Sequence, residues 1–108
     1  DATALGTTAT GVSAQATANF ATSLGRLANA SAIGSTSLGN QSAASALGSV
    51  ALGQVSLASG DNAVALGTES VASGLSAVAV GFQTVASGTA STALGHNSDA
   101  TALATTAV

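Results

Sequence analysis

The sequence of 108 residues contains no cysteine, proline, methionine, tryptophan or tyrosine, and Phe20 and Phe82 are its only aromatic residues. Without cysteine, disulfides and thiolate metal sites are excluded. One arginine and no lysine argue against binding to a phosphate backbone, so we expect no nucleic-acid partner. No apolar run exceeds four residues, whereas a membrane-spanning helix needs about 20. We therefore expect no direct contact with a membrane.

What the sequence does contain is a 14-residue repeat, which begins at Asp1 and continues to the end without an insertion. Three successive copies read LASGDNAVALGTES (57–70), VASGLSAVAVGFQT (71–84) and VASGTASTALGHNS (85–98). A fixed period is typical of repeat architectures. We predict a single repeat domain over 1–108, with seven full coils and a partial eighth. Because the chain starts and stops within the repeat, we interpret it as a fragment of a longer chain.

Some positions of the repeat are almost invariant, whereas positions one, five, six, twelve and thirteen vary freely. Position two is always alanine, position three is serine or threonine, and position eight is threonine or valine. Position eleven is glycine in every complete copy, as Gly11, Gly25, Gly39, Gly53, Gly67, Gly81 and Gly95. Position ten is apolar in seven of the eight copies, as in Leu24, Leu38, Leu52, Leu66, Val80 and Leu94. We interpret these two columns as the structural framework of the repeat.

This pattern excludes a helix and predicts strands. Every complete block holds glycine together with hydroxyl residues, and these residues, like β-branched ones, are poor in helix interiors. The alternation has the period of two that a strand requires. We predict two short strands in each block, near positions 14 to 4 and 7 to 10, with turns at positions 5–6 and 11–13. The fold is then an all-β parallel roll whose coils, at about 4.8 Å each, span roughly 35–40 Å.

The glycines also predict a difference between the two halves of the chain. Position six carries glycine in three of the first four copies, as Gly6, Gly34 and Gly48, whereas position four carries it in the second half, as Gly60, Gly74 and Gly88. We predict that this turn is re-formed between coils four and five, while the length of each coil stays the same.

The shortage of bulky residues predicts an oligomer. We expect the leucine and valine ladder of position ten in the interior of the roll, and alanine columns at close contacts. A roll this thin has little interior, so a second apolar face closed against identical chains would supply the missing burial. The pattern does not decide which face meets the neighbouring chain.

One motif resembles a known family. Asn62–Ser70 reads N-A-V-A-L-G-T-E-S and resembles the head repeat of trimeric autotransporter adhesins such as YadA, with the pattern N-S-V-A-I-G-x-x-S. Further copies occur at 48–56, 76–84 and 90–98, and looser ones precede Gly48. The resemblance implies a left-handed parallel β-roll built from 14-residue coils and assembled as a homotrimer.

The resemblance also implies a function. It implies the extracellular head of a longer protein on the bacterial outer membrane, with a part in virulence, which attaches without catalysis to host cells or to collagen, fibronectin or laminin. The residues that it implies for ligand binding are Asn62, Ala63, Val64, Ala65, Leu66, Gly67 and Ser70. We add Phe82 because exposed aromatic residues can anchor partners, although packing against a neighbouring chain explains it equally well.

Catalytic and metal sites are not indicated. All titratable side chains fall on variable positions, and one histidine with no base–nucleophile pair beside it offers no catalytic arrangement. His96 and Asp99 could lie close together, but two ligands do not make a metal site. The glycines match no nucleotide-binding motif. We therefore expect no enzyme activity, no metal and no cofactor.

An ice-binding solenoid is the alternative hypothesis. Threonine and serine ladders at positions three and eight would give regularly spaced rows of hydroxyl groups. Position eight becomes valine in coils four to six, at Val50, Val64 and Val78, and this interrupts one of the rows. A thermal-hysteresis assay separates this hypothesis from an adhesin head.

Overall fold

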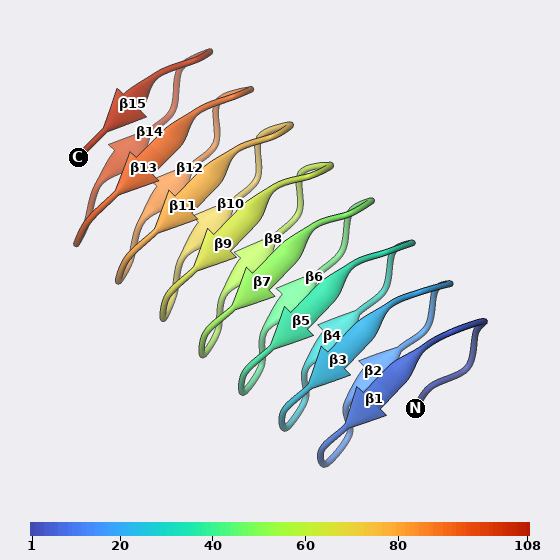
Figure 1. Cartoon of the computed structure of the whole chain (residues 1–108). Coiled ribbons are helices and arrows are strands. Elements are labelled where there is room, and N and C mark those ends of the chain that lie inside the picture. The colour runs from blue at the N-terminus through green and yellow to red at the C-terminus, as the bar shows by residue number, and fades with distance from the viewer.

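Two short strands in each coil build two parallel sheets that lie back to back along the whole chain (Figure 1). The computed structural model describes residues 1–108. The eight-stranded sheet holds β1 (Thr8–Thr10), β3 (Thr22–Leu24), β5 (Thr36–Leu38), β7 (Val50–Leu52), β9 (Val64–Leu66), β11 (Val78–Val80), β13 (Thr92–Leu94) and β15 (Thr106–Ala107). The seven-stranded sheet holds β2 (Gln15–Ala16), β4 (Asn29–Ala30), β6 (Ala43–Ala44), β8 (Leu57–Ala58), β10 (Val71–Ala72), β12 (Val85–Ala86) and β14 (Asp99–Ala100).

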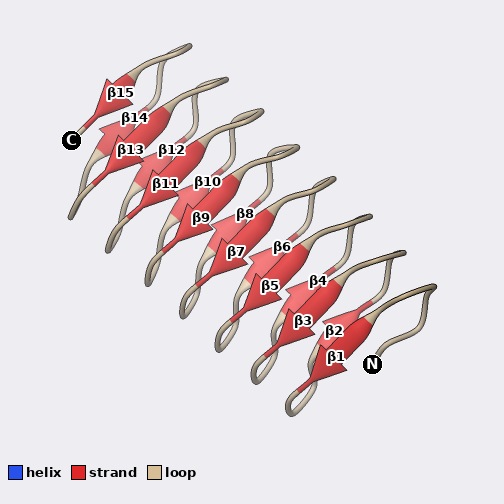
Figure 2. Cartoon of the chain, in the orientation of Figure 1, coloured by secondary structure: helices blue, strands red, loops and turns tan.

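Every strand pairs with the equivalent strand of the next coil, so the register is constant. Val64 pairs with Val78 in one sheet, and Val71 pairs with Val85 in the other. All strands are parallel, and no helix interrupts them (Figure 2). The molecule measures 37 × 20 × 11 Å, and its long dimension confirms the length predicted for about eight stacked coils. The parallel solenoid of 14-residue coils is therefore confirmed.

The predicted turns are confirmed as well, and the glycines of position eleven have a clear physical reason. Gly25 has a φ of +131°, and a Cβ atom there would lie 2.6 Å from the carbonyl oxygen of Gly39 in the next coil. A side chain at this position would thus collide with backbone and also strain its own conformation. Gly95 is the exception, because a Cβ atom there meets nothing within 4 Å.

In each complete coil, the turn that follows the strand of the eight-stranded sheet contains a conformation that the sequence did not predict. Position thirteen has φ near +58° in all seven complete coils, although no glycine occupies it. The residues that adopt this left-handed conformation are Ser13, Leu27, Gln41, Val55, Glu69, Gln83 and Asn97. Of these, Val55 is the least suited, because a β-branched side chain is rarely found there.

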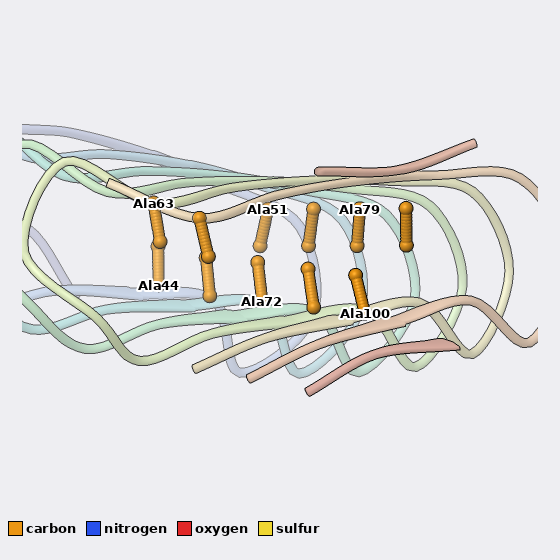
Figure 3. Close-up of a cluster of buried hydrophobic side chains, with 11 residues drawn as sticks. Ala44, Ala51, Ala63, Ala72, Ala79 and Ala100 are labelled. Atoms are coloured by element: carbon orange, nitrogen blue, oxygen red, sulfur yellow. The ribbon is translucent and has the colours of Figure 1, made fainter. Parts of the chain in front are cut away.

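The interior of the roll corrects our prediction for position ten. The buried side chains are alanine, serine and Thr84, and they come from positions two, seven, nine and fourteen. Alanines of the two sheets face one another across the narrow interior (Figure 3). Leu24, Leu38, Leu52, Leu66 and Val80 are instead half-buried on the outside, and Leu94 is 37% exposed. The predicted alternation of inward and outward side chains is confirmed, but the prediction that position ten points inwards is wrong. Two sheets this close together have room only for small side chains between them.

The turn before the eight-stranded sheet also differs from the prediction. Position six keeps the left-handed conformation in every coil, whether as Gly48 (φ +62°) or as Asn62 (φ +57°). The backbone bonds are preserved too, since Ser49 N donates to Ala46 O in coil four and Ala63 N donates to Gly60 O in coil five, both at 3.0 Å. The turn is therefore not re-formed between the halves. Glycine moves from position six to position four, while the turn keeps its conformation.

Candidate assembly and adhesive surface

The outer side of the eight-stranded sheet carries the side chains of positions eight and ten. We call this surface the Leu/Val face. Its position-ten side chains are apolar from coil two onwards, and position eight adds Val50, Val64 and Val78 in the middle of the molecule. None of the titratable residues lies on these two positions, because they occupy positions one, five, twelve and thirteen. The face is thus uncharged along the roll, and from coil two onwards it carries a continuous apolar column beside threonine or valine.

The outer side of the seven-stranded sheet is different. Its position-three residues are exposed serines or threonines in all eight coils, from Thr3 to Thr101. Beside them, position one is mixed and includes Asp1 and Asp99 at the two ends. We call this surface the hydroxyl face. The hydroxyl rows of positions three and eight therefore lie on opposite sheets and do not share one face, and ice binding by either row stays untested.

The two edges of the roll also differ in character. The edge formed by positions four to six exposes large apolar side chains, and we call it the apolar rim. Its exposed members are Leu5 (68%), Phe20 (61%), Ile33 (54%), Leu47 (51%), Leu75 (51%) and Leu103 (73%). Position five is not freely variable as predicted, because leucine or isoleucine occupies it in five of eight copies. Counting residue types at that position would have found this rim.

The opposite edge, at positions eleven to thirteen, carries mostly polar side chains, and we call it the polar rim. Two side-chain contacts join neighbouring coils there. Gln83 Nε2 donates a hydrogen bond to Glu69 Oε2 at 2.9 Å. The rings of Phe82 and His96 lie 5.2 Å apart between centroids, at an angle of 43°. Phe82 is 44% exposed, so its ring remains available to a partner.

The structure separates the residues implied for ligand binding instead of bringing them into one site. Ala63, Ala65 and Ser70 are fully buried, and the Ser70 hydroxyl donates to Gly67 O at 2.9 Å. These three residues have no surface to offer a ligand, and they shape the interior. Val64 and Leu66 belong to the Leu/Val face.

The remaining two exposed members lie on opposite edges. Asn62 is exposed on the apolar rim, whereas Phe82 lies on the polar rim. Gly67 lies between the Leu/Val face and the polar rim, where its φ of +130° and its close approach to Gly81 give it a structural role. Ligand binding by any member of this set stays a prediction.

The surface has no pocket. No three histidine, aspartate or glutamate side chains come together in a group that could hold a metal ion. The structure also contains no helix of the length and hydropathy that membrane crossing requires. The surfaces that the roll offers are the two flat faces and the two rims.

Comparison with known families gives one match. The family model of the YadA head domain repeat, which describes two copies of the repeat, matches residues 1–28, 30–56, 58–84 and 86–108. The chain belongs to the YadA head family. A search of curated proteins finds no match.

Membership of the YadA head family identifies the chain as an adhesin-type head of a trimeric autotransporter. The family is a structural adhesin domain that is not known as enzymatic, and it implies an extracellular, surface-exposed position. The constant 14-residue coil keeps equivalent positions in register from one coil to the next.

Proposed function

We propose that this chain is the head of a bacterial surface adhesin, that it assembles as a homotrimer, and that it attaches to host matrix proteins or host cells without catalysis. Residues 1–108 form a single repeat domain of a longer outer-membrane protein. The observation that carries the assembly is the Leu/Val face, an uncharged apolar strip on the outside of a roll whose interior holds no large side chain.

The distribution of apolar side chains supports assembly. In an ordinary domain the leucines and valines are inside, where burial stabilises the fold by about 1.5–3 kcal/mol for each side chain. Here the interior holds only alanine, serine, threonine and glycine, so those side chains remain on the surface. Assembly of three copies would cover the Leu/Val face of each chain and bury these side chains. Monomeric proteins rarely expose long apolar strips.

The surfaces left over after such assembly support adhesion. The hydroxyl face and the polar rim point away from the Leu/Val face, and they repeat the same groups from coil to coil. A trimer presents each group three times, so weak contacts add up through avidity. Collagen, fibronectin and laminin, together with host cell surfaces, are the partners that we propose, and Phe82 is the one aromatic anchor on these surfaces.

The assembly is tested by the mass of the chain in solution. Light scattering at several concentrations should give three chains for the unaltered protein and a smaller species for Leu52→Asn combined with Leu66→Asn on the Leu/Val face. The matched control is Val71→Asn combined with Val85→Asn on the hydroxyl face, where Asn29 already occupies the same position. A monomer at every concentration, or equal behaviour of the two double variants, contradicts the proposal.

Adhesion is tested on surfaces coated with collagen, fibronectin, laminin or whole host cells. The trimer should bind at least one of them, and Phe82→Ala should weaken that binding while leaving the mass unchanged. Gln54→Ala, at the same position of the polar rim two coils earlier, serves as the control. Absence of binding to every surface would rule out the adhesive part of the proposal.

A further inference from the structure

We propose that the apolar rim is the second half of the contact between subunits, so that the rim of each subunit packs against the Leu/Val face of the next one. This inference rests on the trimer of the proposed function, and it adds the geometry of the contact. The rim follows the row of turns that lead into the odd-numbered strands, at the upper right of Figure 1.

Exposure is the first argument. The side chains of the apolar rim are the more exposed of the two apolar sets, at 51–73% for its five aliphatic members. The residues of the Leu/Val face are mostly half-buried already. The rim carries one charged residue, Asp61, in eight coils. A nearly uncharged strip of this length on one edge indicates a surface that a partner covers.

Symmetry is the second argument. In a ring with three-fold symmetry, each subunit contacts its two neighbours through two different patches. One patch contacts the next subunit, and the other contacts the previous one. A trimer therefore needs two different complementary surfaces on each chain. The Leu/Val face and the apolar rim are two such surfaces that follow the same 14-residue spacing. The rim carries a large exposed apolar side chain in six of the eight coils, and Asp61 and Thr89 take that place in the other two. Their columns can thus stay in register along the whole molecule.

Area is the third argument. The strands of the Leu/Val face are two or three residues long, so the strip is narrower than the 20 Å width of the molecule and is a small contact beside the roughly 1,000 Å² that a stable interface should exceed. Covering the adjoining rim as well enlarges the contact along the 37 Å length of the molecule.

The test uses substitutions whose products already occur at the same positions of this chain. Leu47→Asn combined with Leu75→Asn places at position five the residue found there as Asn19. Leu27→Gln combined with Val55→Gln is the control on the polar rim, because position thirteen already carries Gln41 and Gln83. All four side chains are 40–51% exposed in the single chain, so the two double variants remove similar exposed apolar surface.

The expected result is a shift in the concentration at which the trimer dissociates. The apolar-rim variant should need at least about a hundredfold higher concentration to assemble, whereas the polar-rim control should assemble like the unaltered chain. Circular dichroism of both variants should show the same β spectrum, because none of the four side chains is in the interior.

Two outcomes overturn the inference. If the apolar-rim variant assembles normally while the Leu/Val-face variant does not, the rim lies outside the subunit contact and the proposed trimer stands. Loss of matrix or cell binding in that intact trimer would assign the rim to a ligand instead. If the unaltered chain is a monomer, the trimer of the proposed function fails, and this inference fails with it.

Discussion

The first four coils and the three that follow have the same backbone but different interiors. In coils two and three, position nine is Ser23 and Ser37, whereas every later coil has alanine there. The continuous buried cluster of eleven alanines runs only from Ala44 to Ala100, and the earlier coils have a separate cluster of three. One coil geometry is therefore supported by a hydroxyl-rich interior in one half and by an alanine interior in the other.

Local hydrogen bonds explain how the first half tolerates its hydroxyl groups. Ser35 Oγ and Ser49 Oγ each donate to a carbonyl oxygen three residues earlier, at 2.7 Å. The Ser37 and Ser42 hydroxyls bond to each other at 2.6 Å, and the Ser42 hydroxyl is also bonded to Gly39 O at 3.0 Å. Buried hydroxyls that are satisfied in this way cost little. The second half needs fewer of these bonds, but it needs glycine at position four.

The largest expected effect comes from that glycine. Gly74→Ala should lower the free energy of unfolding by about 3 kcal/mol or more, because its Cβ atom would lie 2.6 Å from the carbonyl carbon of Gly88. Chemical denaturation followed by circular dichroism measures the loss. Gly34→Ala is the control, since it has the left-handed φ but nothing within 4 Å, and it should cost at most about 1 kcal/mol. Equal losses would show that the close approach in the second half is unimportant.

A serine of the first half gives the next effect. Ser37→Ala converts coil three to the arrangement of coil five, where Ala65 and Ser70 occupy the same positions. We expect a loss of about 1 kcal/mol, because one hydrogen bond disappears while Ser42 keeps its bond to Gly39. The same denaturation experiment measures it. A loss above about 3 kcal/mol would mean that the two interiors are not interchangeable.

Strain at the boundary between the halves predicts a gain. Val55→Asn should raise the free energy of unfolding by about 1 kcal/mol, because asparagine tolerates the left-handed conformation better than a β-branched residue. Asn97 already adopts it at the same position, with φ +59°. Thermal unfolding shows the gain as a higher midpoint. Glu69→Asn in the next coil, which replaces an unbranched residue, should raise the midpoint less.

The smallest effect is expected at an unpaired hydroxyl. Ser23 Oγ is buried and has no hydrogen-bond partner, in contrast to Ser37. Ser23→Ala should leave stability unchanged or raise it by up to about 1 kcal/mol, because it removes an unsatisfied polar group. Measured beside Ser37→Ala, it separates the hydroxyls that stabilise the first half from the one that does not. A clear loss of stability would contradict this distinction.

The sequence predicted what depends on local chemistry. Period-two alternation placed the strands, and the recurring glycines placed the turns, so the parallel solenoid and its length followed. It did not predict which phase of the alternation points inwards, because leucine was assumed to be buried. That choice depends on the distance between the two sheets. Small side chains set this distance, such as Ala58 of one sheet and Ala65 of the other, which belong to the same buried cluster.

The surface was predicted less well than the fold. The motif predicts one group of residues, but adjacent members such as Val64 and Ala65 point to opposite sides of β9. The left-handed conformation at Val55 is not predictable from a glycine, because no copy of the repeat has glycine at that position. The apolar rim was not predicted because position five carries Asn19, Asp61 and Thr89 in three copies as well as leucine or isoleucine in the others. A column of residues on an edge can form an apolar surface when most, but not all, of its members are apolar.

The hydrogen bonds between coils run along the long axis of the molecule, since every strand bonds only to the strands one coil before and after it. Tension applied along that axis, as on an attached cell in flowing liquid, therefore loads the bonds of one coil boundary together. A 14-residue coil that detaches releases about 46–50 Å of extended chain, in place of one rise of about 4.8 Å. We expect the head to lengthen under load one coil at a time, because each coil is bonded only to the coils before and after it.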